Sequence, residues 1–286
     1  NDDPTVEADT ASVTVDEGGT AGNSGTVGDV DGDTVTLSAS AGNVTNNNDG
    51  TWSWSFPSSD GPAESQLVTI SADDGNGGNA SVTFSLTVDN VAPTASAGAD
   101  QTVNRNDTVN VSGAWTDPAG AADNAYAWSW DLDGDSAADV SEGAASYGDS
   151  ANASTSFATE GMYTLSFSVS DKDGGSHSDS LTVTVLNVPP DCSLAAPSVT
   201  ELWPPNHKMV PVSILGVTDV EGDAITIAID SIFQDEPVDD KGDGSTAPDG
   251  AGVSTTTAEV RAERAGGGNG RFYHISFSAD DGHGGS

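Results

Sequence analysis

The stretch Val68-Thr69-Ile70-Ser71-Ala72-Asp73 recurs twice in related form, as Leu165-Ser166-Phe167-Ser168-Val169-Ser170-Asp171 and as Ile275-Ser276-Phe277-Ser278-Ala279-Asp280. Side chains alternate between apolar and small polar in all three copies, which is the pattern of a half-buried β-strand. A Gly-rich turn follows each copy, and the first two turns lead into a second alternating strand, 82–88 and 181–185. The repeat therefore predicts the last hairpin of a β-sandwich, three times over.

Similar linkers separate these repeats. Asp89-Asn90-Val91-Ala92-Pro93 and Leu186-Asn187-Val188-Pro189-Pro190 each follow a final strand, and the chain opens on Asn1-Asp2-Asp3-Pro4. Proline removes a backbone donor and stiffens such junctions. We expect three modules of roughly 95 residues each, the size of an immunoglobulin-like sandwich. Their predicted bounds are 1–91, 92–188 and 189–286.

The composition supports an all-β fold over disorder. The chain has 286 residues, of which 35% are hydrophobic, 34 are Gly and 13 are Pro. The apolar residues stand in short alternating runs rich in Val and Thr, which a disordered chain lacks. The fold class is therefore all-β, with three tandem immunoglobulin-like sandwiches.

The third repeat stops just after its Gly-rich turn, where the other two supply a last strand. The expected third sandwich thus lacks its last strand and has an unpaired sheet edge. Two explanations stay open: the given chain is a piece of a longer precursor, or a strand of another chain fills the gap, as in donor-strand assembly.

These motifs resemble known families of surface modules. The second module resembles a polycystic-kidney-disease (PKD) domain in its Ala97-Gly98-Ala99-Asp100 opening, its Trp128-Ser129-Trp130-Asp131-Leu132-Asp133-Gly134-Asp135 segment and its Gly161-Met162-Tyr163-Thr164-Leu165 strand. The first resembles cadherin-like and immunoglobulin-like repeats of large bacterial surface proteins. The third is similar to immunoglobulin-like modules found beside PKD repeats. The resemblance implies extracellular, non-catalytic, calcium-stabilised modules.

The charge balance excludes several classes of partner. Lys and Arg number 7 against 45 Asp and Glu, which gives a net charge of −38. Nucleic-acid binding needs clustered Lys and Arg, and docking on anionic lipid needs the same. No apolar stretch approaches the roughly 20 residues of a membrane helix. We expect neither nucleic acid nor membrane insertion.

The strongest candidate metal site is an Asp-rich loop in the second module. Its acidic residues occupy positions 1, 3, 5, 9 and 12 of the segment 131–142, and they are Asp131, Asp133, Asp135, Asp139 and Glu142. Converging carboxylates repel by roughly 4 kcal/mol per pair at 4 Å and an effective dielectric of 20, unless a cation lies between them. Hard oxygen ligands without nearby His or Cys favour Ca²⁺. A solvated turn is the alternative.

Further calcium ligands are predicted in the other modules and in the linkers. Two acidic triplets precede a strand. Asp29, Asp31 and Asp33 form the first, and Asp219, Glu221 and Asp223 stand at the matching position of the third repeat. Carboxylates of the last hairpins would join them: Asp73 or Asp74, and Asp280 or Asp281. The linkers resemble cadherin junctions, which implies Asp2, Asp3, Asp89 and Asn90 as ligands. A loop with acids at 235, 236, 239, 240, 243 and 249 is either a further site or a mobile segment.

Two tryptophan pairs occur at the same place in the first two repeats. Trp52 and Trp54 share one face of a predicted strand, and so do Trp128 and Trp130. Such pairs either stack on sugar rings or fill the sandwich core, and the repeated position favours the core.

Nothing in the sequence favours catalysis. His177, His207, His274 and His283 are scattered without zinc-site spacing, and Cys192 has no His nearby. The acids lie in wet Gly/Asp turns, not in the apolar pocket that a glycosidase acid needs. Arg261, Glu263, Arg264 and Arg271 lie around one predicted hairpin, where an ion-paired structural cluster is favoured over an anion site.

The sequence therefore predicts a calcium-stabilised, non-enzymatic repeat array of the cell surface or extracellular medium. Its partners would be neighbouring modules, other copies of the chain, or a polysaccharide or cell-surface ligand. The alternatives are a filament or matrix subunit that assembles by strand donation, and a set of accessory carbohydrate-binding modules of a secreted hydrolase.

Overall fold

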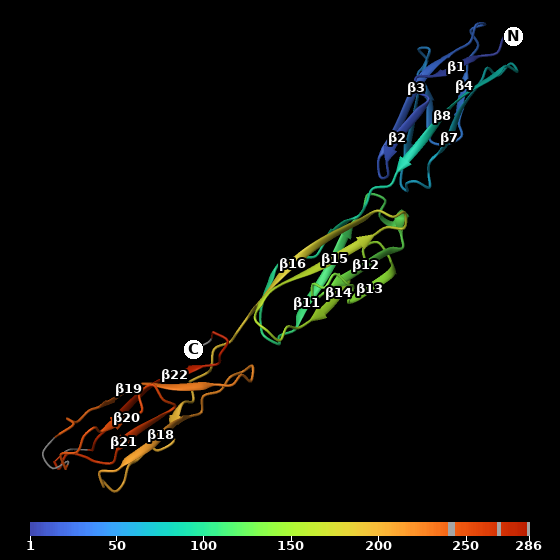
Figure 1. Cartoon of the computed structure of the whole chain (residues 1–286). Helices are drawn as coiled ribbons and strands as arrows, with labels where there is room; N and C mark the ends of the chain where they lie inside the picture. Colours follow the sequence, from blue (N-terminus) through green and yellow to red (C-terminus); the bar gives the residue numbers. More distant parts are fainter. Residues whose placement is uncertain (240–243, 268–269, 285–286) are drawn as a thin grey trace. The chain divides into compact units, whose positions relative to one another are not determined.

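The computed structural model describes residues 1–239, 244–267 and 270–284, and these form three groups of β-strands in chain order (Figure 1). Among the described residues there is no α-helix, and the one helical turn is the 3-10 segment Gly120–Asp123. No helix among them is long and apolar enough to cross a membrane. The predicted all-β class is confirmed.

The first sandwich packs two four-stranded sheets. One has the order β1-β3-β6-β5, with β1 at Thr5–Ala8, β3 at Thr20–Gly28, β6 at Thr51–Pro57 and β5 at Asn43–Asn46. The other has the order β2-β8-β7-β4, with β2 at Ser12–Asp16, β8 at Asn79–Asp89, β7 at Gln66–Asp73 and β4 at Thr36–Ala39. The predicted last hairpin is the antiparallel pair β7 and β8, and β2 joins β8 in parallel.

The second sandwich repeats this plan with different strand numbers per sheet. Its larger sheet has the order β10-β16-β15-β12-β13, with β10 at Gln101–Asn104, β16 at Ser176–Leu186, β15 at Gly161–Ser170, β12 at Tyr126–Asp131 and β13 at Val140–Ala145. The smaller has the order β14-β11-β9, with β14 at Ala151–Thr155, β11 at Val109–Thr116 and β9 at Thr94–Ser96. The predicted hairpin is formed by β15 and β16.

The third sandwich has one four-stranded sheet and one two-stranded sheet. The first has the order β17-β18-β21-β20, with β17 at Ala196–Pro197, β18 at Met209–Leu215, β21 at Thr257–Arg261 and β20 at Gly250–Ala251. The second pairs β19, at Thr226–Gln234, with β22, at Tyr273–Asp280. Among the described residues, β22 has no partner on its other edge. The equivalent edges of β7 and β15 pair with β8 and β16. The predicted missing last strand is thus confirmed for the described part of the chain.

A cavity of about 510 Å³ lies beside this open edge. Val212, Val260 and Ile275 line it from the inner faces of β18, β21 and β22, and Trp203 and Phe272 lie at its rim. Residues 198–208, where the first sandwich has β2, are not in a strand here.

The tryptophan pairs lie in the cores. Trp52, Trp54, Trp128 and Trp130 are 0%, 3%, 7% and 0% exposed. The indole N–H of Trp52 donates to the Glu7 carbonyl at 3.0 Å, and that of Trp130 to the Ala151 carbonyl at 2.9 Å. These side chains cannot stack on a sugar, so a sugar-binding platform built from them is wrong and the core interpretation is right.

Two compact units divide the chain, and their border runs through the second sandwich. The first unit holds 1–101, 110–155 and 163–183, and the second holds 102–109, 156–162 and 184–286. The linker around Asn90 lies inside the first unit, and the linker around Asn187 lies inside the second. The boundaries 1–91, 92–188 and 189–286 stay a prediction.

Candidate metal centre

Each Asn-x-x-Pro segment contacts the last hairpin of the sandwich that follows it. The linker amide nitrogen donates to a hairpin carboxylate: Asn1 to Asp74 at 2.8 Å, Asn90 to Asp171 at 3.1 Å and Asn187 to Asp281 at 2.7 Å. The same contact at three places shows that the linker and the Gly-rich turn form one repeated local structure.

The Gly-rich turn is shaped for this contact. One oxygen of Asp74 accepts the amides of Asn76 and Gly78 at 2.8 and 2.9 Å, so the other oxygen is free to face the linker. The hydrogen bonds from Asn1 and these amides hold the pKa of Asp74 below its usual range. A Cβ at Gly175 would lie 2.7 Å from the Ala92 Cα. The glycine therefore lets the linker backbone approach.

The first aspartate of each acidic loop leaves an oxygen buried without a hydrogen-bond partner. These residues are Asp29, Asp117 and Asp219, and the oxygen is Oδ2 in all three. Their Oδ1 atoms accept amides of their own turns at 2.8 Å, from Asp31, Ala119 and Glu221 in that order. A buried unpaired carboxylate oxygen is costly, so its recurrence at one repeat position makes these three oxygens candidate metal ligands.

The next acid of the loop binds the linker backbone, but the second sandwich lacks it. Asp31 accepts the Asp2 amide at 2.7 Å and Glu221 accepts the Val188 amide at 3.0 Å. The second sandwich has Ala119 at this position. There the amide of Val91 donates instead to Glu17, which comes from the turn after β2, at 2.9 Å.

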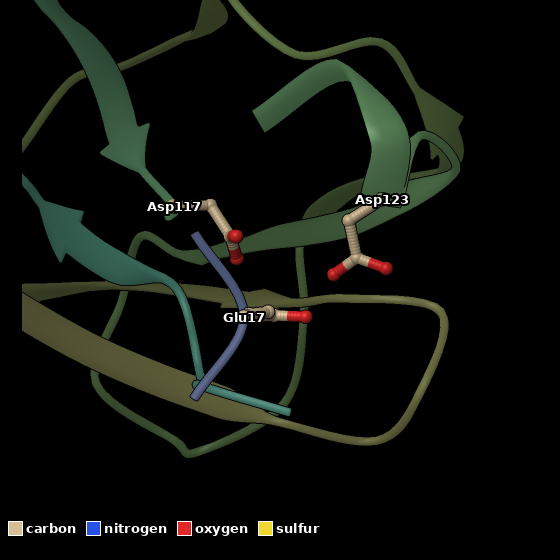
Figure 2. A group of neighbouring side chains, drawn as sticks. All are labelled: Glu17, Asp117 and Asp123. Carbon is tan, nitrogen blue, oxygen red and sulfur yellow. The ribbon is translucent and has the colours of Figure 1, made fainter. Parts of the chain in front are cut away.

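Glu17 thereby completes a buried group with Asp117 and Asp123 (Figure 2). The three residues are 2%, 7% and 0% exposed, and one oxygen of each lies within 4.8 Å of the others. Asp117 Oδ2, Asp123 Oδ2 and the Asn90 Oδ1 are buried without partners. Burial raises the pKa of Asp117 and raises that of Asp123 to about 6. The group has the oxygen ligands and the excess negative charge that a divalent cation requires.

Lys172 contacts one side of this group. Its Nζ lies 2.5 Å from Asp123, 2.6 Å from Asp60 and 2.7 Å from Asp173. The ammonium therefore neutralises one oxygen of Asp123, and the Asp123 Oδ2 remains available.

The structure brings several predicted ligands together. One oxygen from each member lies within 4.8 Å of the others in three predicted groups, which are Asp29, Asp31 and Asp33; Asp131, Asp133 and Asp139; and Asp219, Glu221 and Asp223. In the group of Asp131, Asp133 and Asp139, the carboxylates already accept hydrogen bonds from backbone amides. Asp131 accepts from Gly134 at 2.7 Å and Ser136 at 2.9 Å, which lowers its pKa.

Other predicted ligands lie apart from these groups. Asp135 accepts the Ala137 amide at 2.7 Å, and Glu142 lies exposed on β13. Asp73 and Asp280 are exposed, and their buried neighbours Asp74 and Asp281 face the linkers instead. The Asp89 side chain is exposed. Its backbone carbonyl accepts a hydrogen bond from the Glu17 amide at 3.0 Å.

Sequence reasoning missed Glu17, Asp117, Asp123 and Asp171. Signals existed for two of them, because Thr116-Asp117 stands at the repeat position of Thr218-Asp219 and Asp171 ends the second copy of the hairpin repeat. Asp123 and Glu17 come from a 3-10 turn and from the preceding sandwich, and no local spacing connects them.

The predicted ion-paired cluster is confirmed for Arg261, Glu263 and Arg271, whereas Arg264 is exposed. The side chain of Arg271 is 1% exposed, and its guanidinium lies 2.5 Å from Asp249, 3.0 Å from Glu263 and 3.4 Å from Glu236. Asp249 and Glu236 belong to the predicted acidic loop, so they bind this arginine. Asp240, Lys241 and Asp243 of that loop lie outside the described residues.

The comparisons with known proteins agree with this repeat structure. Residues 1–87 match the family model of the bacterial Ig domain, and residues 97–185 match that of the K319L-like PKD domain. The first sandwich is thus similar to a bacterial Ig domain and the second to a PKD domain, and we refer to them by these names. In the candidate metal centre, the Ig domain contributes Glu17 and the PKD domain contributes Asp117 and Asp123. Ig and PKD repeats are generally non-catalytic, which supports a structural or adhesive role.

Solved structures with tandem or PKD domains are similar to the chain. Domains A168-A170 from titin are 12% identical over 98% of this chain and 94% of that one, with a TM-score of 0.41. The PKD domain of an M14-like peptidase from Thermoplasmatales archaeon SCGC AB-540-F20 is 20% identical, covers 34% of this chain and 97% of that one, and has a TM-score of 0.30. The human desmocollin-1 ectodomain is 9% identical over 98% and 58%, with a TM-score of 0.30. No curated protein matches the chain.

Proposed function

We propose that the chain is a non-catalytic, calcium-stabilised segment of an extracellular or cell-surface stalk or adhesive array. The observation that carries this proposal is the buried group of Glu17, Asp117 and Asp123, which brings carboxylates of the Ig and PKD domains together and leaves Asp117 Oδ2 and Asp123 Oδ2 without hydrogen-bond partners. Calcium there would link two domains, which is the mechanical requirement of a stalk.

Calcium fits the ligand set better than a transition metal does. Every candidate ligand is a carboxylate or amide oxygen, and Cys192 is exposed and free. Such oxygen-only sites suit Ca²⁺, whereas zinc sites use Cys and His. Calcium at millimolar concentration is available outside cells, so this chemistry and the family setting point to the same compartment.

Replacing Asp117 by Asn tests the calcium site. One ion at a free concentration of ~1,000 times its Kd stabilises the folded state by about 4.1 kcal/mol. We expect calcium to raise the melting temperature of the first unit within the full chain, measured by calorimetry. Asp117→Asn should remove most of that rise. Without calcium, the variant should be as stable as the wild type or more so, because a buried repulsion is lost.

Asp149→Asn provides the matched control, because Asp149 is an exposed carboxylate of the same PKD domain. It should leave the calcium-dependent rise unchanged. An equal rise in the wild type and in Asp117→Asn would contradict the assignment.

A cavity in the third sandwich suggests a second candidate function, assembly by strand addition. The cavity measures about 510 Å³, and its lining includes Val212, Val260 and Ile275 together with the charged Glu201, Glu263 and Arg264. An extended strand from a second copy would pair with β22 and cover Val212, Val260 and Ile275. Sedimentation velocity should then show larger species as protein concentration rises, and a monomer at the highest concentration would exclude this candidate.

A further inference from the structure

The residue after β2 in the Ig domain and the residue after β10 in the PKD domain occupy the same place in the fold. They are Glu17 and Arg105, which follow the similar segments 14–16 and 102–104. The Glu17 amide donates to the carbonyl of Asp89, the last residue of β8, at 3.0 Å. The Arg105 amide donates to the carbonyl of Leu186, the last residue of β16, at the same distance. One backbone position thus presents opposite charges to the next sandwich.

We call the two groups joints. The first joint is Glu17, Asn90, Asp117 and Asp123, within the first compact unit. The second joint is Arg105, Asn187, Asp219, Glu221 and Asp223, within the second unit.

At the second joint the guanidinium occupies the place of a bridging cation. Arg105 contacts Asp223 through two nitrogens, at 2.5 and 3.1 Å, and the two side chains are 9% and 14% exposed. It also donates to the Asn187 Oδ1 at 3.5 Å. The corresponding atom of the first joint, Asn90 Oδ1, is buried without a partner. The equivalent amide oxygen therefore accepts a hydrogen bond from arginine at the second joint and has no partner at the first.

We infer that calcium closes the first joint, whereas Arg105 holds the second joint closed without calcium. This inference rests on the proposed calcium binding. Removing calcium leaves Glu17 facing Asp117, which repels it at short range in a buried site, and Lys172 neutralises only the Oδ1 side of Asp123. At the second joint, calcium removal leaves Asp219 and Glu221 more negative, so their attraction for Arg105 grows. Removing calcium therefore weakens the contacts of the first joint and strengthens those of the second.

Other charged contacts do not cancel this difference. Lys172 also links the Ig and PKD domains, because its Nζ contacts both Asp60 and the buried Asp123. This ammonium lies on Oδ1 of Asp123 and leaves Asp117 Oδ2 and Asn90 Oδ1 without partners, so it does not replace Arg105 at the equivalent place. At the second joint, His283 lies 3.2 Å from Glu160, with both side chains more than a third exposed. Asp219 Oδ2 and Glu221 Oε1 remain without partners there, so a calcium ion can bind the third sandwich, but Arg105 supplies the bridge.

The backbone amides of Val91 and Val188 report on the two joints separately. The Val91 amide donates to Glu17 in the first joint, and the Val188 amide donates to Glu221 in the second. We expect a chelator to raise the hydrogen-exchange rate of Val91 by about tenfold or more in the full chain, measured by NMR, and that of Val188 by less than about twofold. Equal responses of the two amides would overturn the inference, and this comparison needs no variant.

Substitutions at Arg105 test its role as the bridge. With Arg105→Glu, the second joint acquires the charge of the first, so exchange at Val188 should become calcium-dependent by about tenfold. Arg105→Gln removes the charge alone, and it should raise exchange at Val188 to a similar extent with and without calcium. Full protection of Val188 in Arg105→Gln would overturn the inference.

The outcomes separate this inference from the proposed function. A calcium-dependent melting temperature combined with equal responses at Val91 and Val188 would overturn the inference alone. If neither the melting temperature nor the exchange rates of Val91 and Val188 depended on calcium, both the inference and the proposed function would be overturned.

Discussion

Replacing Arg271 by Leu is expected to destabilise the third sandwich by about 3–5 kcal/mol, because it removes the nearest counter-charge of two buried carboxylates. Asp249 and Glu263 are 1% and 0% exposed at their side chains, and both contact this guanidinium. Leucine restores some apolar volume but supplies no donor. Calorimetry of the full chain should show the unfolding transition of the third sandwich at a clearly lower temperature.

Arg264→Leu is the control, because Arg264 lies on the surface of the same sandwich. It should change the free energy of unfolding by no more than about 0.5 kcal/mol. Similar transitions for both variants would show that the buried pairs do not stabilise the third sandwich.

Replacing Trp52 by Ala is expected to destabilise the Ig domain by about 3–5 kcal/mol. The indole is fully buried among the core residues of both sheets, and its N–H serves the Glu7 carbonyl. Truncation therefore creates a large cavity and also removes this hydrogen bond. Chemical denaturation followed by fluorescence of the remaining tryptophans would measure the loss.

Leu67→Ala is the matched control in the same domain, because Leu67 is 64% exposed on β7. It should cost far less than the change at Trp52. If Trp52→Ala were as mild as Leu67→Ala, the indole would not be a central part of the core.

The strands could be predicted from the sequence because their side-chain alternation is local. The hairpins of β7 with β8 and of β15 with β16 fall where the repeated alternation places them, and β22 matches the third copy. The buried pair Trp52 and Trp54 also followed from its repeated position. These predictions needed only the period of a strand and the identity of its turn residues.

The acidic loops could be predicted in part. Asp29, Asp31 and Asp33 converge as expected because they belong to one turn. Asp73 was the predicted ligand, but Asp74 is the carboxylate that contacts the linker. The backbone direction at the end of a strand decides that, and alternation alone places either residue at the hairpin.

The sequence by itself determined that the chain is an acidic, all-β repeat with Gly-rich hairpins and Pro-containing linkers, since periodicity and composition are local properties. Only the tertiary structure decided that Glu17 joins Asp117 and Asp123, and that Arg105 meets Asp223 at the equivalent position. These groups come from different sandwiches. Their charges interact only where folding brings them within a few ångströms of each other and excludes water.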